Sequence, residues 1–204
     1  AIIHEDIAYC SWRDACLVVV DVKDRANLRL IVHKVWAPPF GGGTHNALPL
    51  AKRDLLIVVD ETVLDDQEDG FKPIWVFDNQ VKSNPISIAT FPEPTDKDYL
   101  KVGGHFGPHN IHENRPGSFQ SEELIFATYQ NAGVRVYDIR NHLRPQEVAG
   151  FVPPTPPARW VDPAAPWLPE IGASPTGTTL EAAIVARVAL RYDDHPQVGT
   201  LSCR

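Results

Sequence analysis

Leu17-Val18-Val19-Val20-Asp21 is the stretch that decides the fold, because the chain repeats its pattern twice. The second copy is Ile74-Trp75-Val76-Phe77-Asp78, and the third is Val134-Arg135-Val136-Tyr137-Asp138. Each copy is a run rich in β-branched and aromatic residues that ends at an aspartate, and the three aspartates are 57 and 60 residues apart. Such runs are typical of buried strands. The repeat therefore predicts three equivalent strands in an all-β protein.

Further short apolar runs surround each copy and predict additional strands. One precedes each copy, at 7–12, 55–59 and 124–129, and one follows it, at 30–32, 86–89 and 148–151. Inner strands are expected at 44–50 and 108–114, and residues 1–4 resemble the end of a third. A repeated unit of four antiparallel strands is the signature of a β-propeller blade. A β-sandwich with accidental internal similarity is the alternative.

The number of repeats predicts an incomplete propeller of about three blades within residues 1–153. Closed propellers carry about 4–8 blades, so we expect either a piece of a longer protein or a partner chain that completes the ring. The lack of methionine and the start at Ala1 favour a piece. Residues 154–204 do not continue the repeat: they predict a proline-rich linker and an irregular tail, in which 179–192 fits a helix or a strand.

Composition excludes several classes of protein. The formal net charge of −7 argues against nucleic-acid binding, which normally needs a basic patch. No apolar run approaches the roughly 20 residues of a membrane-spanning helix. No export signal is visible, and the three cysteines cannot all pair within one chain. These features predict a reducing compartment, the cytoplasm.

The histidines of the inner strands are the strongest candidates for chemistry. His45-Asn46 and His109-Asn110 occupy equivalent positions in two repeats, and the inner strands of a propeller converge on its axis. We therefore predict a metal site in the central channel with the ligands His45, His105, His109 and His112. Imidazole favours a divalent transition metal, here copper, zinc or iron.

Other interpretations of these residues stay open at this point. The histidines could be purely structural hydrogen-bonding groups, or one could act as a general base without a metal. Glu113 and Arg115 are candidate catalytic residues beside His112, with an exposed ion pair as the alternative. The repeated aspartates Asp21, Asp78 and Asp138 are expected to cap turns rather than to form a carboxylate cluster.

The repeated motif resembles that of the LVIVD-repeat proteins, which are bacterial β-propellers. Stretches 9–14, 41–45 and 106–119 are similar to motifs of one branch of this family, and the resemblance covers about residues 4–165. A more remote similarity is to selenium-binding proteins, propellers whose histidines hold copper, although their cysteine motif is not found here.

The resemblance implies a propeller fold, but a fold by itself does not determine what a protein does. We expect a metal-dependent oxidoreductase or hydrolase acting on a small molecule. The alternative is a non-catalytic binding or scaffold propeller.

Overall fold

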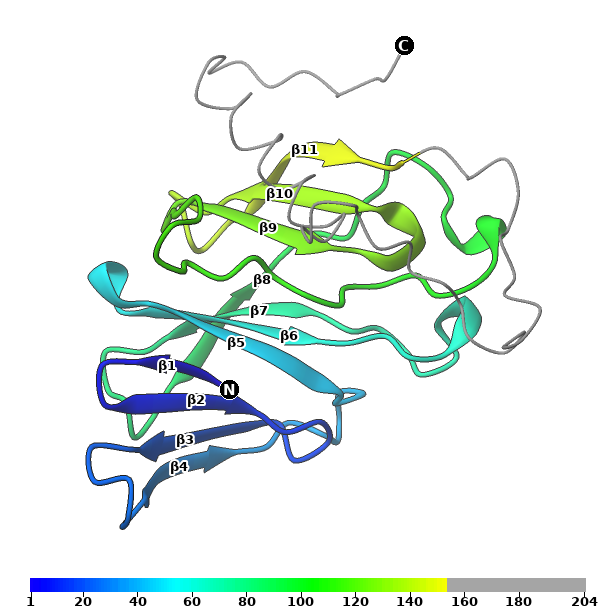
Figure 1. The fold of residues 1–204 in the computed structure, drawn as a ribbon. Helices are drawn as coiled ribbons and strands as arrows, with labels where there is room; N and C mark the ends of the chain where they lie inside the picture. Colours follow the sequence, from blue (N-terminus) through cyan, green and yellow to red (C-terminus); the bar gives the residue numbers. More distant parts are fainter. Residues whose placement is uncertain (154–204) are drawn as a thin grey trace, which may run out of the picture.

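The fold consists of three antiparallel β-sheets, seen in a computed structural model that describes residues 1–153 (Figure 1). The tail expected at 154–204 lies outside the described residues. The first sheet contains β1 (Ile2–His4), β2 (Ile7–Ser11), β3 (Leu17–Asp21) and β4 (Arg29–Lys34); the second contains β5 (Thr44–Leu50), β6 (Leu55–Asp60), β7 (Ile74–Asp78) and β8 (Ile86–Thr90); the third contains β9 (Leu124–Thr128), β10 (Val134–Asp138) and β11 (Gln146–Phe151).

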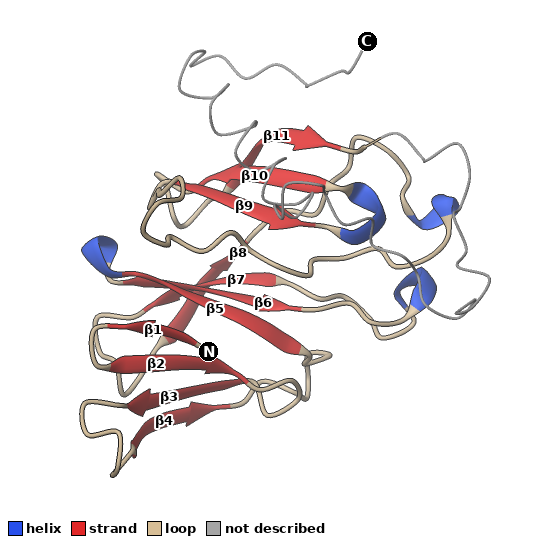
Figure 2. Ribbon diagram, in the orientation of Figure 1, coloured by secondary structure: helices blue, strands red, loops and turns tan. Residues whose placement is uncertain are grey.

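The all-β prediction is confirmed for residues 1–153. Their only helical elements are four short 3-10 turns, which Figure 2 shows in blue at the edges of the sheets; they are Ala51–Arg53, Asp65–Gln67, Leu100–Val102 and Gln130–Ala132. Within each sheet, strands that are consecutive in the chain pair with each other. No sheet of the described residues closes on itself. No helix in this part of the chain is long and apolar enough to cross a membrane.

The three sheets share one local irregularity, a β-bulge, at the same position. The strands of the repeated motif, β3, β7 and β10, each shift register against the next strand two residues before the aspartate. The skipped residues are Ile31, Ile88 and Val148, each ten positions after the aspartate of its own repeat. A bulge places one extra residue on one strand, which bends that strand and increases its local twist. Most positions in a sheet have no bulge, so its recurrence at one position of three sheets is informative. The sequence repeat is therefore also a structural repeat.

The repeated aspartates cap the turns that follow these strands, as expected. One carboxylate oxygen of Asp21, Asp78 and Asp138 accepts a hydrogen bond from the amide two residues later, over 3.0, 2.9 and 2.8 Å. Aspartate favours such turns because its short side chain reaches its own backbone. The three carboxylates stabilise separate turns.

The middle sheet is buried on both faces. Leu55, Ile57 and Val59 of β6 pack towards the third sheet, whereas the alternate residues Leu56 and Val58 pack towards the first. Since side chains alternate between the faces of a strand, an uninterrupted apolar run suits a sheet with neighbours on each side. The sheets consequently stack in sequence order, with β5–β8 between the other two (Figure 1).

The third sheet has three strands, whereas four were expected. Segment 108–114 lies beside β9 but pairs with it through a single isolated bridge, Ile111 to Ala127. Three backbone hydrogen bonds join the segment to β9: His109 N to Thr128 O over 3.0 Å, Thr128 N to Asn110 O over 2.8 Å, and His112 N to Phe126 O over 2.9 Å. Between them the pattern is interrupted, because the Ile111 amide donates to Asn46 Oδ1 over 3.1 Å. Asn46 belongs to β5, so the segment is shared between two sheets.

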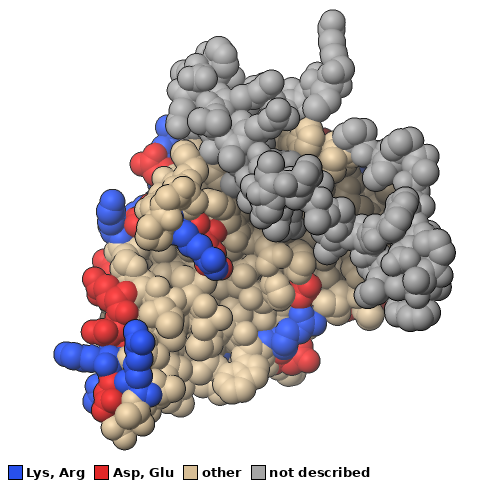
Figure 3. Space-filling view, in the orientation of Figure 1, with Lys and Arg blue, Asp and Glu red and all other residues tan. Residues whose placement is uncertain are grey.

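Charges of both signs are interspersed on the visible part of one face of the molecule (Figure 3). On the face shown in Figure 3, acidic and basic side chains lie close together and form no continuous basic patch. This distribution agrees with the acidic composition.

Candidate metal centre

Backbone hydrogen bonds bring four chain segments together at the start of β5. The amides of Arg13 and Thr44 each donate to the other residue's carbonyl over 3.0 Å. The Glu61 amide donates to Gly43 O over 2.8 Å, and the Thr62 amide donates to Pro108 O over 3.2 Å. Side chains of the first sheet, the middle sheet and segment 108–114 therefore meet here.

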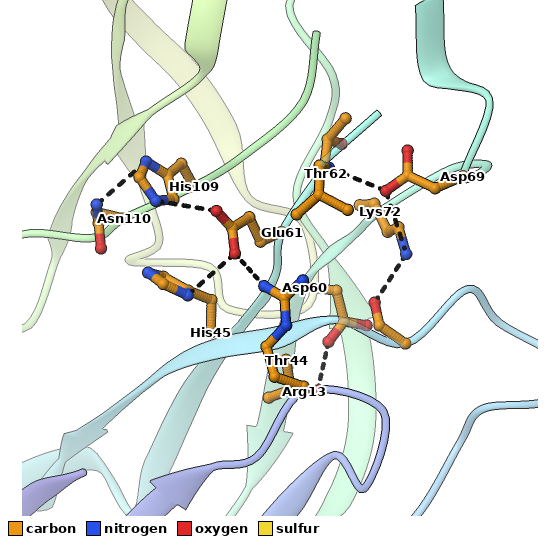
Figure 4. A network of polar contacts seen from close by, with 12 residues as sticks. Arg13, Thr44, His45, Asp60, Glu61, Thr62, Asp69, Lys72, His109 and Asn110 are labelled. Atoms are coloured by element: carbon orange, nitrogen blue, oxygen red, sulfur yellow. Dashed lines mark hydrogen bonds and ion pairs between the residues drawn. The ribbon is translucent and has the colours of Figure 1, made fainter. Parts of the chain in front are cut away.

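Glu61 is the centre of the resulting cluster (Figure 4). Its Oε2 lies 3.1 Å from His45 Nδ1 and also accepts a short hydrogen bond from Arg13 Nη1. Its Oε1 lies 3.0 Å from His109 Nε2. The two imidazole rings lie partly over each other, with centroids 4.8 Å apart. One carboxylate thus holds a guanidinium and two imidazoles.

The spacing of these groups suits a metal ion. One donor atom from each of His45, Glu61 and His109 lies within 4.8 Å of the others. A tetrahedral zinc ion with bonds of about 2.0–2.1 Å keeps its ligand atoms about 3.3 Å apart. Both histidines are one-third exposed, whereas Glu61 is 12% exposed. The group could therefore hold a metal ion that stays accessible from solvent.

A neighbouring residue fixes the orientation of His109. The amide nitrogen of Asn110 lies 3.2 Å from His109 Nδ1, so that Nε2 faces Glu61 (Figure 4). In this arrangement Nδ1 accepts from the Asn110 amide group, so Nε2 carries the proton and donates to Glu61. A metal on Nε2 would need the proton on Nδ1 and the amide oxygen of Asn110 turned towards it, because a histidine ligand donates its second ring N–H to an acceptor.

Buried polar contacts anchor the strand ends on either side of the cluster. Asp60 is fully buried and accepts hydrogen bonds from Thr44 Oγ1 at 2.6 Å and from the indoles of Trp36 and Trp75 at 2.8 Å. Burial raises the pKa of this carboxyl group, and these hydrogen bonds oppose the rise. Because Asp60 and Thr44 precede Glu61 and His45, their contact sets the spacing of the two candidate ligands.

A second anchor is Lys72, which is only 4% exposed. Its Nζ donates to the carbonyls of Gly41 and Gly42 over 2.7 and 3.1 Å, and lies 3.6 Å from Asp69 Oδ2. Lys72 therefore ties the glycine segment that leads into β5 to the loop that follows Glu61.

The surroundings of His45 lower its pKa and so favour the neutral imidazole. Burial lowers its pKa below the ordinary 6.5; the charge of Glu61 raises it, and His109 and Arg13 lower it. Metals bind the neutral imidazole, since a proton and a metal compete for the same lone pair. The lowered pKa thus extends metal competence below the pH at which an ordinary histidine is half protonated.

Glu61→Gln is expected to lower the pKa of His45 further, because the carboxylate charge stabilises the imidazolium. NMR titration of the metal-free protein measures this, with His142 as an internal reference. Since the folded pKa is below the unfolded value of 6.5, His45 favours folding above about pH 6.5. That contribution is lost as pH falls through 6.5 towards the folded pKa. An unchanged or higher pKa in the variant would contradict the assigned electrostatics.

The structure brings together two of the four predicted metal ligands, His45 and His109. His105 lies elsewhere, with its Nε2 3.2 Å from Asp65 Oδ1. His112 Nε2 contacts the Phe119 carbonyl at 2.9 Å, and its ring packs edge-on against Phe126. Neither belongs to the group of close donor atoms around Glu61.

The two predicted catalytic residues pair with each other away from this cluster. Arg115 Nε donates to Glu113 Oε2 over 2.6 Å, and both line a cavity of about 820 Å³ together with residues of β1 and the end of β5. His4 lines the same cavity. The ion pair expected as the alternative for Glu113 and Arg115 is present.

Sequence reasoning missed Glu61 and Arg13. The relevant pattern was the pairing of 44–50 with the run that begins at Leu55: antiparallel register aligns Thr44 with Asp60 and so places Glu61 beside Gly43. Arg13 lies in the turn between β2 and β3, and nothing in its local sequence indicates the contact with a different sheet.

No model of a known protein family matches the chain, and no curated protein sequence matches it significantly. The chemistry assigned to this site therefore rests on its own residues.

Proposed function

We propose that this chain is an LVIVD-type β-propeller segment whose His45–Glu61–His109 group binds a divalent transition metal and acts on a small molecule. The observation that carries the proposal is the convergence of three donor atoms within 4.8 Å from three separate chain segments. The histidine pair comes from equivalent positions in two repeats, as expected of inner strands that converge on a common axis.

The types of the three ligands restrict the reactions that a bound metal could catalyse. Two histidines and one carboxylate leave coordination positions open, as in catalytic zinc sites and in non-haem Fe(II) oxygenases. Zinc would activate water for hydrolysis, whereas iron or copper would support a redox reaction. We therefore propose a metal-dependent hydrolase or oxidoreductase, with zinc, iron or copper as the candidate metals.

The architecture supports a propeller. Three sheets with the same bulge and the same aspartate-capped turn stack in sequence order, and the middle one is covered on both faces. One sheet of this kind cannot bury both faces alone. We propose that further blades, from the same protein or from a partner chain, complete the ring. Cys10 and Cys16 form no disulfide within residues 1–153, which supports a reducing compartment such as the cytoplasm.

One observation favours the alternative, a non-catalytic binding or scaffold propeller. Arg13, His45 and His109 already occupy both oxygens of Glu61. In that case the cluster would be a structural network of ion pairs and hydrogen bonds that joins the first sheet to segment 108–114. Metal binding decides between the two functions.

The test is metal analysis of the full chain, purified without chelators and also reloaded with one equivalent of Zn²⁺, Fe²⁺ or Cu²⁺. We expect close to one metal per chain. His109→Ala and Glu61→Gln should each weaken metal retention by roughly 100-fold or more, because each removes one of the three donors that the described residues bring together.

Matched controls are His142→Ala, His105→Ala and His112→Ala, all expected to retain the metal. Circular dichroism of each variant checks that the fold is intact. If the wild-type chain binds no metal, or if His109→Ala binds it as tightly as wild type, the scaffold function stands instead.

A further inference from the structure

We infer that the metal centre takes a small oxyanion, a carboxylate or phosphate group, which Arg13 binds beside the metal. The inference rests on the proposed function and names the substrate class of that site. It follows from the position of Arg13, from the charge of the cluster and from the chemistry of guanidinium.

The position of Arg13 is set by its backbone, which leaves the side chain free to exchange partners. The two hydrogen bonds with Thr44 hold the backbone, and its φ of 50° lies in the left-handed region. The side chain is 49% exposed, and its ion pair in the described part of the chain is with Glu61. Arg13 therefore stays at the cluster whichever anion it binds.

Arg13 and His45 converge on one atom. Nη1 of Arg13 and Nδ1 of His45 both contact Oε2 of Glu61. A metal held by His45 and Glu61 would therefore lie next to the guanidinium and compete with it for the same oxygen. Binding of the metal weakens the Arg13–Glu61 pair and makes the guanidinium available to a ligand.

The charge of the metal-loaded cluster favours the binding of an anion. A metal binds the neutral form of each imidazole, and in that form of the site the charges of Arg13 and Glu61 cancel before the ion enters. A divalent ion raises the formal charge to +2 at a site of which both histidines are one-third exposed. Like charges this close repel even at the high effective dielectric of a protein surface. An anion from solution removes that repulsion.

The chemistry of the two cations selects oxyanions. Guanidinium binds carboxylate and phosphate with two parallel hydrogen bonds. The metal keeps an open position for a substrate oxygen. A group with two oxygens can therefore contact both cations, whereas a neutral amide lacks the charge that the site requires.

Arg115 is a matched control within the same chain. It is an exposed arginine that pairs with a glutamate, Glu113, and it lies in the cavity near the end of β5 rather than at His45. Its replacement removes the same charge from the surface without touching the cluster.

The experiment uses the chain loaded with one equivalent of Co²⁺, whose visible absorption reports both occupancy of the site and ligands that join the metal. Acetate, inorganic phosphate and neutral acetamide are titrated into wild type, Arg13→Gln, Arg13→Lys and Arg115→Gln. Parallel titrations of the metal-free chain are followed by NMR chemical shifts. Circular dichroism confirms folding.

We expect acetate or phosphate, but not acetamide, to change the spectrum of the wild type. Arg13→Gln should lower the affinity of the Co²⁺-loaded chain for the oxyanion by roughly tenfold or more. The same variant should bind Co²⁺ more tightly, because a competing cation is removed. Arg13→Lys should be intermediate, and Arg115→Gln should match wild type. Comparison of acetate with phosphate identifies which oxyanion the site prefers.

Two results would overturn the inference: equal oxyanion affinity in wild type and Arg13→Gln, or equal affinity with and without Co²⁺. A chain that holds Co²⁺ but ignores every oxyanion refutes this inference alone. A chain that holds no Co²⁺ refutes the proposed function and this inference together.

Discussion

Gly107→Ala should destabilise the protein by about 3 kcal/mol, at the upper end of the usual cost of overpacking. A Cβ at this position would lie 1.9 Å from Thr62 Oγ1 and 2.7 Å from Thr62 Cβ. Thr62 is only 1% exposed and its amide is bonded to Pro108 O, so neither side of the contact can move away freely. Chemical denaturation followed by tryptophan fluorescence measures the loss.

The same substitution should disturb the metal centre. Gly107 lies two residues before His109, and Thr62 lies next to Glu61, so separating the two segments separates two candidate ligands. We expect weaker metal binding in Gly107→Ala even under conditions in which the protein remains folded.

A double substitution and a control isolate the cause. Thr62→Ala in the Gly107→Ala background should recover part of the stability, because it removes the closest atom; Thr62 Oγ1 makes no hydrogen bond among the described residues. Gly117→Ala is the control, since its φ is 84° but no atom lies within 4 Å of the new Cβ. It should cost about 1 kcal/mol of backbone strain. Equal losses for Gly107 and Gly117 would contradict the steric explanation.

Asp60→Ala should also destabilise the protein by about 3 kcal/mol or more. The substitution leaves a buried hydroxyl of Thr44 and the indole N–H groups of Trp36 and Trp75 without their common acceptor. A buried donor that loses its partner costs about 1–3 kcal/mol. Asp60→Asn preserves the volume and one acceptor oxygen, so a smaller loss is expected.

Fluorescence of Trp36 and Trp75 reports this change directly, because both indoles contact the altered side chain. Asp98→Ala is the surface control: its carboxylate is 52% exposed and pairs with Lys101, so its removal should cost far less stability than Asp60→Ala. A loss at Asp60 no larger than that at Asp98 would show that the buried network contributes little to stability.

The candidate site was predictable from sequence in part. The His-Asn pairs at 45–46 and 109–110 occupy equivalent places in two repeats, and the structure places both histidines on one carboxylate. His112 lies within segment 108–114 and His105 lies three residues before it, but closeness in sequence does not fix the direction of a side chain. His112 is only three residues after His109, yet its ring faces Phe119 and Phe126.

The strands and turns follow from local sequence. Short runs of β-branched and aromatic residues favour strands, and the aspartate that ends each run accepts a hydrogen bond from the backbone amide two residues later. Both effects act over a few residues, so the repeat at 17–21, 74–78 and 134–138 predicted the sheets without further information.

The contacts of Glu61 and Arg13 were decided by tertiary structure alone. Arg13 is 48 residues from Glu61, and the two meet because Arg13 pairs with Thr44 of another sheet. Segment 108–114 shows the same effect at one amide, since Asn46 of β5 accepts the hydrogen bond of Ile111 while the segment keeps backbone hydrogen bonds to β9. A sequence pattern encodes which residues are buried and which end a strand. The packing of one sheet against the next determines which strand ends, and therefore which side chains, come within bonding distance.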